Sequence, residues 1–132
     1  MNNARILIVD DEPINLRLLE RILQSQGYTN LVLVQDPREV LERYQEHKIC
    51  LIMLDINMPY LDGYQVMEQL KALHDPLLPP IIVLTAKNDD EHLLRALDAG
   101  ARDYVTKPFN ANELLMRVRN LLDVQQAHRL VL

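Results

Sequence analysis

The sequence has few of the residues that mark several common kinds of site. Cys50 is its single cysteine, which excludes an internal disulfide, and its place within an apolar run indicates a buried core thiol. The three glycines, Gly27, Gly63 and Gly100, form neither the G-x-G-x-x-G of a dinucleotide site nor a P-loop. The four histidines lack the spacing of zinc ligands. These absences argue against a zinc, nucleotide or disulfide-based site.

Long apolar runs and clusters of positive charge are also absent. No apolar stretch approaches the roughly 20 residues that cross a bilayer, and no charged-then-apolar leader opens the sequence. The formal net charge is −5 and the Lys and Arg residues are dispersed, whereas a nucleic-acid surface needs them clustered. We therefore expect a cytoplasmic protein that binds neither a membrane nor nucleic acid directly.

The sequence does contain a regular alternation of apolar runs and stretches of helical period. Its 132 residues are 48% apolar, which is enough for one core. Five units follow one another, each with an apolar run and then a helical stretch. The runs cover residues 5–9, 31–34, 50–54, 81–84 and 103–105. Strands that are apolar at nearly every position are buried on both faces, so we predict a doubly wound α/β domain with a five-stranded parallel sheet.

The last helical stretch continues past the predicted end of the domain near Leu122. Its apolar positions recur every three or four residues, and the later members of this heptad pattern turn polar. The members are Ala111, Leu114, Val118, Leu121, Gln125, His128 and Leu132. We assign residues 1–122 to the domain and 123–132 to an extension of the last helix toward a second domain or a partner helix. A frayed terminus is the alternative.

Polar side chains follow four of the apolar runs where each predicted strand ends. They are Asp10 and Asp11, Asp55, Thr85, and Lys107. Because the carboxyl ends of parallel strands lie along the ligand-binding edge of an open α/β sheet, we expect these side chains to share one pocket. Three carboxylates at one point repel one another by about 4 kcal/mol per close pair at an effective dielectric of about 20. Mg²⁺ suits such a pocket because it needs few protein ligands, so the three aspartates are metal candidates.

The same pocket is suited to phosphoryl transfer. A carboxylate at Asp55, held against Mg²⁺ with Lys107 nearby, is placed to attack a phosphorus atom and become an acyl phosphate. Phosphorylation adds charge and three acceptor oxygens, and movement of Thr85 to donate a hydrogen bond to one of them would be a switch. Taken alone, the Asp-Asp-Glu after the first run also fits an N-cap and a solvated first turn.

A Mg²⁺-dependent phosphatase with an aspartate nucleophile is the alternative function. It would share the carboxylates at the strand ends and the metal. However, the companion acid usually found two residues after such a nucleophile is Asn57 here, and we find no length for a substrate cap. This alternative predicts repeated turnover of an aryl phosphate without a trapped intermediate.

Five motifs of the sequence resemble the receiver domain of two-component response regulators, the family of the chemotaxis regulator, over residues 4–122. They are Ile8-Val9-Asp10-Asp11-Glu12, Leu54-Asp55-Ile56-Asn57-Met58-Pro59 with Asp62-Gly63, Leu84-Thr85-Ala86, Gly100-Ala101, and Tyr104-Val105-Thr106-Lys107-Pro108-Phe109. The resemblance implies a flavodoxin-like sheet with the strand order 2-1-3-4-5. It also implies that the protein is a phosphorylation-dependent signalling switch.

The resemblance assigns roles to the residues of the acidic pocket. Asp55 is implied to be the phosphoacceptor. Asp11 and Asp55 are implied to bind Mg²⁺ directly, together with the backbone carbonyl of Asn57, and Asp10 to act through a metal-bound water. Lys107 is implied to contact the phosphate, and its bond to the following proline resembles the cis peptide of the family, an isomer available at modest cost only before proline.

Further roles implied by the resemblance concern the switch and its rate. Thr85 is coupled to Tyr104, whose ring turns inward when the phosphate is present. Asn57 and Lys87 flank the phosphoryl site and are associated with the rate of hydrolysis. The protein is then not a conventional enzyme, because it catalyses only its own Mg²⁺-dependent phosphorylation and slow dephosphorylation.

The implied partners lie on both sides of this switch. The phosphoryl group comes from a histidine of a partner kinase or phosphotransfer protein. The output surface is the face of the fourth helix, fifth strand and fifth helix, and it controls an output domain or effector protein together with the last helix. The run 125–129 resembles connectors that lead to cyclic-dinucleotide enzymes. A stand-alone regulator and a homodimer stay open.

Overall fold

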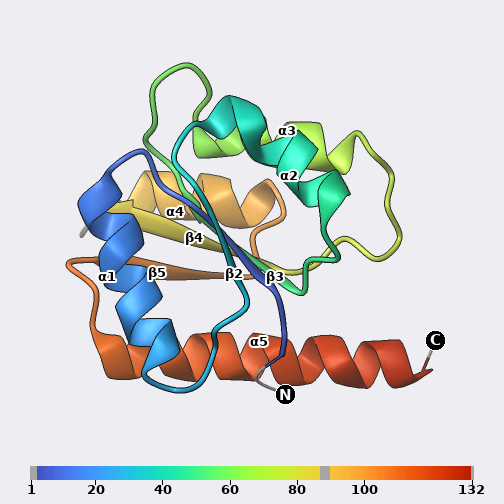
Figure 1. Ribbon diagram of the computed structural model, residues 1–132. Helices are drawn as coiled ribbons and strands as arrows, with labels where there is room; N and C mark the ends of the chain where they lie inside the picture. Colours follow the sequence, from blue (N-terminus) through green and yellow to red (C-terminus); the bar gives the residue numbers. More distant parts are fainter. Residues whose placement is uncertain (1–2, 87–89, 132) are drawn as a thin grey trace.

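The computed structural model describes residues 3–86 and 90–131, with side chains described as far as Asp123. Within that part of the chain, five strands and five α-helices alternate around one sheet, with a short 3₁₀ turn (η1) before α2 (Figure 1). The strands are β1 (Ile6–Val9), β2 (Leu31–Val34), β3 (Leu51–Asp55), β4 (Ile81–Ala86) and β5 (Asp103–Lys107). The helical elements are α1 (Pro13–Gln24), η1 (Pro37–Glu39), α2 (Val40–Glu46), α3 (Gly63–Lys71), α4 (Asp90–Asp98) and α5 (Ala111–Val131).

The five strands form one parallel sheet in the order β2-β1-β3-β4-β5, as the sequence predicted. The last three strands continue further than their apolar runs, and they end at Asp55, Ala86 and Lys107. The strands are longer because the pairing between neighbouring strands continues past the apolar residues. Asp55 pairs with Leu84, and Ala86 pairs with Lys107. Asp55, Thr85 and Lys107 therefore belong to strands, and the sheet fixes their backbones.

Helices cover both faces of the sheet, and each face has its own core. Side chains alternate along a strand, so Leu7 and Val9 of β1 pack with α2, α3 and α4, whereas Ile6 and Ile8 pack with α1 and α5. Figure 1 shows this division, with α5 running along one side of the sheet and α2 and α3 on the other. The central strands β1 and β3 are buried along their full length, which explains their near-continuous apolar sequence.

The helix α5 extends to Val131, and a second domain or partner helix beyond it stays a prediction. Its inward stripe consists of Leu114, Val118 and Leu122, which are buried against the sheet, whereas Ala111 is exposed. The heptad positions Gln125, His128 and Leu132 lie beyond the residues whose side chains are described, and the domain boundary near Leu122 stays a prediction. No helix in the described ranges is both long enough and apolar enough to cross a membrane.

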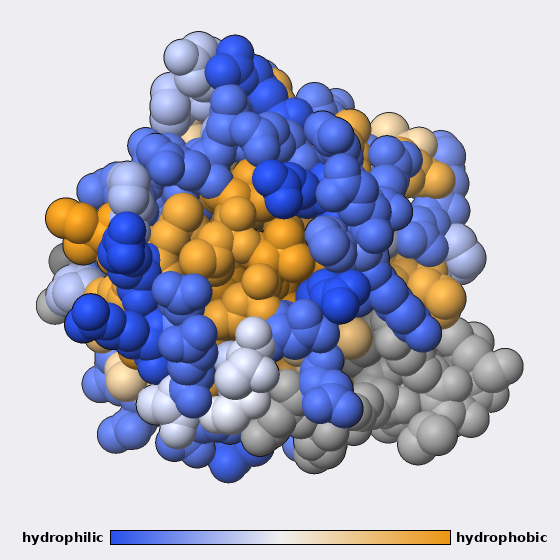
Figure 2. All heavy atoms as spheres, viewed as in Figure 1, coloured by the Kyte–Doolittle hydropathy of each residue, from blue (hydrophilic) through white to orange (hydrophobic). Residues whose placement is uncertain are grey.

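The strand β2 forms an edge of the sheet and is less well covered than β1 and β3. Its first three residues, Leu31, Val32 and Leu33, are half-buried. Figure 2 shows apolar side chains gathered in the centre of the face on which β2 lies in Figure 1, surrounded by hydrophilic residues. The strand has only four residues, and a short edge strand limits unwanted pairing with other chains.

Candidate functional site

The carboxyl ends of the strands bring the predicted acidic residues together. Asp10 directly follows β1 and Asp55 ends β3. One carboxylate oxygen from each of Asp10, Asp11 and Asp55 lies within 4.8 Å of the others. The ammonium Nζ of Lys107, at the end of β5, lies 3.2 Å from Oδ1 of Asp55 and 3.4 Å from Oδ2 of Asp10. Three carboxylates and one cation therefore share this edge of the sheet.

Local backbone structure holds the two buried aspartates in place. The amide of Asp10 donates to the carbonyl of Val34 (3.1 Å), which extends the ladder of β1 with β2 by one residue. Oδ1 of Asp10 accepts from the amide of Glu12 (2.9 Å), where the chain turns into α1. Oδ1 of Asp55 accepts from the amide of Asn57 at 3.3 Å. Both carboxylates are almost fully buried, and Asp11 is half-buried beside them.

The electrostatics of the pocket disfavour a second ionised carboxylate beside Asp10. Burial and the charge of Asp10 raise the pKa of Asp55 to about 7, although Lys107 opposes this rise. Burial by itself would lower the pKa of Lys107, but Asp55 and Asp10 together raise it, so the ammonium stays charged. The pocket thus has more negative charge than its one cation neutralises.

The residues present fit a small divalent cation. Among the described residues, Oδ2 of Asp10 is buried and has no hydrogen-bond partner, although the Lys107 ammonium is near it. When Asp55 is ionised, the three carboxylates and one ammonium have a summed charge of −2, which a divalent ion would neutralise. The donors are all oxygens, the ligand type that Mg²⁺ prefers.

Thr85 and Tyr104 lie on the neighbouring strands. Thr85 follows Leu84, the register partner of Asp55, and is buried. Its hydroxyl donates to the carbonyl of Ala86 at 3.5 Å, which is long for such a bond. Tyr104 of β5 is half-buried, and the guanidinium of Arg117 lies 5.2 Å from the centre of its ring. The coupling predicted between Thr85 and Tyr104 stays a prediction.

Gly63 allows α3 to begin directly against the end of β3. A Cβ atom at this position would lie 2.6 Å from the carbonyl oxygen of Asp55 and 2.8 Å from the Cα of Ile56, closer than real Cβ contacts. The amide of Gly63 donates to the carbonyl of Ile56 (2.8 Å). The sequence predicted a turn at Asp62-Gly63, but only the structure shows that the Gly63 backbone lies against the carbonyl of Asp55.

The remaining predicted features of the site are the Lys107–Pro108 bond, Asn57 and Lys87. The Lys107–Pro108 peptide bond is cis, as the resemblance implied. Asn57 is exposed at the start of the loop between β3 and α3. Lys87 lies outside the described residues. Sequence reasoning missed Arg38 and Tyr60, which line a groove together with Asp11, because neither belongs to a motif.

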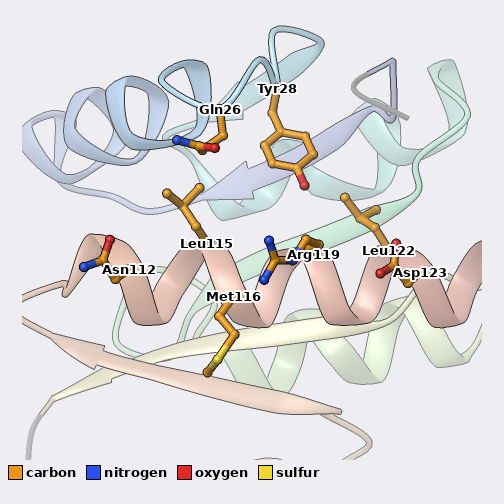
Figure 3. A pocket seen from close by; sticks show the side chains of 8 residues that line it. All are labelled: Gln26, Tyr28, Asn112, Leu115, Met116, Arg119, Leu122 and Asp123. Atoms are coloured by element: carbon orange, nitrogen blue, oxygen red, sulfur yellow. The ribbon is translucent and has the colours of Figure 1, made fainter.

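A second groove lies away from the acidic pocket. It is formed between α5 and the turn from α1 into β2, and Figure 3 shows Gln26 and Tyr28 of that turn facing Leu115, Arg119 and Leu122 of α5. This turn leads into the amino end of β2, opposite to the edge that holds the three aspartates. The groove is therefore not part of the candidate site.

Comparison with known proteins agrees with this geometry. Residues 6–119 match the family model of the response regulator receiver domain. The chain is 44% identical over 119 residues to the response regulator MprA of Mycolicibacterium vanbaalenii. The aligned region covers 90% of this chain and 50% of that protein. It is 39% identical over 120 residues to the alkaline phosphatase synthesis transcriptional regulatory protein PhoP of Bacillus subtilis. This aligned region covers 91% of this chain and 49% of that protein. The chain thus spans about half the length of these relatives.

Solved structures show the same fold. The signal receiver domain of an HD domain-containing protein from Pseudomonas fluorescens has a TM-score of 0.87 and 26% identity, covering 100% of this chain and 96% of that one. A response regulator receiver domain protein from Methanospirillum hungatei has a TM-score of 0.85 and 30% identity, and the match covers 96% of this chain and 98% of that one. The chain belongs to the receiver-domain family of two-component response regulators.

Proposed function

We propose that this chain is a phosphorylation-dependent switch in which Asp55 accepts the phosphoryl group. The observation that carries the proposal is the position of Asp55: it is buried at a strand end, beside Asp10 and Asp11 and 3.2 Å from the ammonium of Lys107. A carboxylate in that position can act as a nucleophile. The cation beside it can neutralise charge that develops on a transferred phosphoryl group.

The phosphodonor that we propose is a phosphohistidine of a histidine kinase or phosphotransfer protein. A carboxylate oxygen of Asp55 forms a bond to phosphorus while the bond from phosphorus to the donor nitrogen breaks. The electron pair of that bond returns to the imidazole nitrogen. The product is an acyl phosphate on Asp55 and a free histidine on the donor.

Mg²⁺ would be held by Asp11, Asp55 and the backbone carbonyl of Asn57, with Asp10 acting through a bound water. When bound, Mg²⁺ supplies positive charge that offsets the repulsion between the carboxylates and the incoming phosphate. Lys107, whose ammonium lies 3.2 Å from Oδ1 of Asp55, would contact the phosphate. Asn57 and Lys87 are proposed to tune the slow hydrolysis by which the protein removes its own phosphoryl group.

The response to phosphorylation is proposed to run through Thr85 and Tyr104 to the face made by α4, β5 and α5. The long hydrogen bond of the Thr85 hydroxyl (3.5 Å) supports this proposal, because a weakly held donor can turn toward a new phosphate oxygen at little cost. A bias of about 1–3 kcal/mol is sufficient to shift two populations substantially.

The output partner is proposed to be a further domain or an effector protein that reads this face and the last helix. The relatives named above support this, because they are about twice as long as this chain and one is a transcriptional regulatory protein. A homodimer is a variant of the proposal. We place the protein in the cytoplasm, where a kinase of this type would phosphorylate it.

Beryllofluoride with Mg²⁺ tests the switch, because it mimics a phosphoryl group on a carboxylate. We expect it to shift the amide signals of residues around Asp55, Thr85 and Tyr104 in an NMR spectrum, and to shift them less when either component is left out. Spectra with no change around any of these three residues would contradict the proposal.

A further inference from the structure

The loop between β3 and α3, residues 56–62, contains a strained turn. Tyr60 has a φ of 71°, and the amide of Leu61 donates to the carbonyl of Pro59 (2.8 Å). These features define a γ-turn with a positive φ at its central residue, a conformation that is rare and strained. The side chain of Tyr60 is 70% exposed, so burial in the core does not hold the residue in this conformation.

A cation from η1 packs on the ring of Tyr60. The guanidinium carbon of Arg38, in η1, lies 3.8 Å from the ring centre. Nε and Nη2 of Arg38 donate a forked pair of hydrogen bonds to the carboxylate of Asp36, to Oδ1 at 3.0 Å and to Oδ2 at 2.8 Å. Asp36 in turn accepts from the amide of Arg38 (3.0 Å). This fork fixes the guanidinium plane, and the plane offers a flat surface for the ring.

This clamp, which we define as Asp36, Arg38 and Tyr60, borders the acidic pocket. All three residues line one groove together with Asp11 and Pro59. On the inner side of the loop, Met58 and Leu61 are half-buried against the core of α2, α3 and α4. The clamp is thus placed to fix the outer side of the loop relative to Asp11 and the connection after β2.

We infer that Arg38 and Tyr60 are positioning residues for the cation site: they hold the β3–α3 loop so that the Asn57 carbonyl faces the ion bound by Asp11 and Asp55. The inference rests on the proposed function. Of the three protein ligands, Asp55 belongs to β3 and Asp11 lies in the short connection from β1 to α1, but the Asn57 carbonyl comes from the loop between β3 and α3. A loop with a strained turn keeps one conformation only if contacts outside the turn favour that conformation. Met58 and Leu61 provide such contacts on the inner side of the loop, and the clamp provides one on its outer side.

Binding of Mg²⁺ alone tests the clamp. We expect Tyr60→Leu and Arg38→Gln each to weaken Mg²⁺ binding about two- to fivefold, the range of an exposed cation–π contact, when the amide shifts of residues 55–57 are followed during titration with MgCl₂. The double variant should be no weaker than either single variant, because both changes remove the same contact. Tyr60→Phe keeps the ring and should bind Mg²⁺ as the wild type does.

The control variant is Arg43→Gln. Arg43 of α2 forms an exposed ion pair with Glu39 of η1 (3.6 Å), and its replacement changes the net charge by the same amount as Arg38→Gln. A lost positive charge alone would strengthen binding of a cation in both variants. Weakening by Arg38→Gln but not by Arg43→Gln therefore supports the clamp, and equal effects of the two changes would overturn it.

Phosphorylation by acetyl phosphate separates this inference from the proposed function. In the clamp variants, the Mg²⁺ concentration for half-maximal phosphorylation should rise while the maximal rate stays that of the wild type. A wild type that binds Mg²⁺ but takes up no phosphate would contradict the proposed function and not the clamp. Clamp variants that are phosphorylated with the Mg²⁺ dependence of the wild type would overturn the clamp and not the proposed function.

Discussion

The Asp55→Asn variant is expected to incorporate no phosphate from acetyl phosphate, whereas the wild type should be labelled when Mg²⁺ is present. In the wild type, a carboxylate oxygen forms the bond to phosphorus and acetate leaves. The amide of asparagine has nearly the same size and keeps the buried site filled, but it has no anionic oxygen to attack. Incorporation of radioactive phosphate into the purified chain measures the difference.

The matched control for this experiment is Asp98→Asn. Asp98 is exposed at the end of α4, and the substitution makes the same change of charge and shape away from the acidic pocket. Labelling of this variant should equal that of the wild type. Labelling of Asp55→Asn at the rate of the wild type would place the phosphoacceptor at another residue.

The second large effect concerns stability without a metal. Because burial and Asp10 raise the pKa of Asp55 from 3.8 to about 7, the folded state keeps a proton on Asp55 that the unfolded state loses above about pH 4. The free energy of unfolding should therefore fall as the pH rises from about 4 to about 7, since the folded state binds more protons over this range. At about 1.4 kcal/mol for each pH unit, the loss is at most about 4 kcal/mol.

The difference between the wild type and Asp55→Asn isolates this contribution. The asparagine side chain cannot ionise, so the variant should become more stable than the wild type as the pH rises through this range, by about 1–4 kcal/mol at about pH 8. Urea unfolding at several pH values in the presence of a chelator measures both proteins. Groups such as Asp36 and Asp75, whose pKa values are lowered, contribute equally to the two proteins and cancel. Equal pH dependence in both would contradict the raised pKa.

Sequence reasoning predicted the sheet and the composition of the acidic pocket because both follow from one regularity. Apolar runs of strand length place polar residues such as Asp10, Asp55 and Lys107 at strand ends, and parallel strands bring those ends to one edge. The extension of β4 to Ala86 and of β5 to Lys107 was not predicted. It depends on hydrogen bonds between neighbouring strands, whose register the residues of a single strand do not determine.

The contacts around the pocket could not be predicted from the sequence, and the reason differs from one contact to the next. The clamp joins Arg38 of η1 to Tyr60 of the β3–α3 loop, which are far apart in the sequence, and a positive φ at tyrosine has no sequence signal comparable to that of glycine. Gly63 does have such a signal, and a turn was predicted there. Its actual φ is not in the positive range, and the glycine is needed because the Asp55 carbonyl lies so close.

Chemical trapping of the phosphorylated residue tests the central claim most directly. Borohydride reduces an acyl phosphate on aspartate to the alcohol, which leaves homoserine in its place. After treatment with acetyl phosphate and Mg²⁺, followed by borohydride, mass spectrometry of the digested protein should find homoserine at position 55 and aspartate at positions 10 and 11. Homoserine at another position, or repeated release of phosphate with aspartate unchanged at position 55, would contradict the assignment of Asp55 as the phosphoacceptor of a switch.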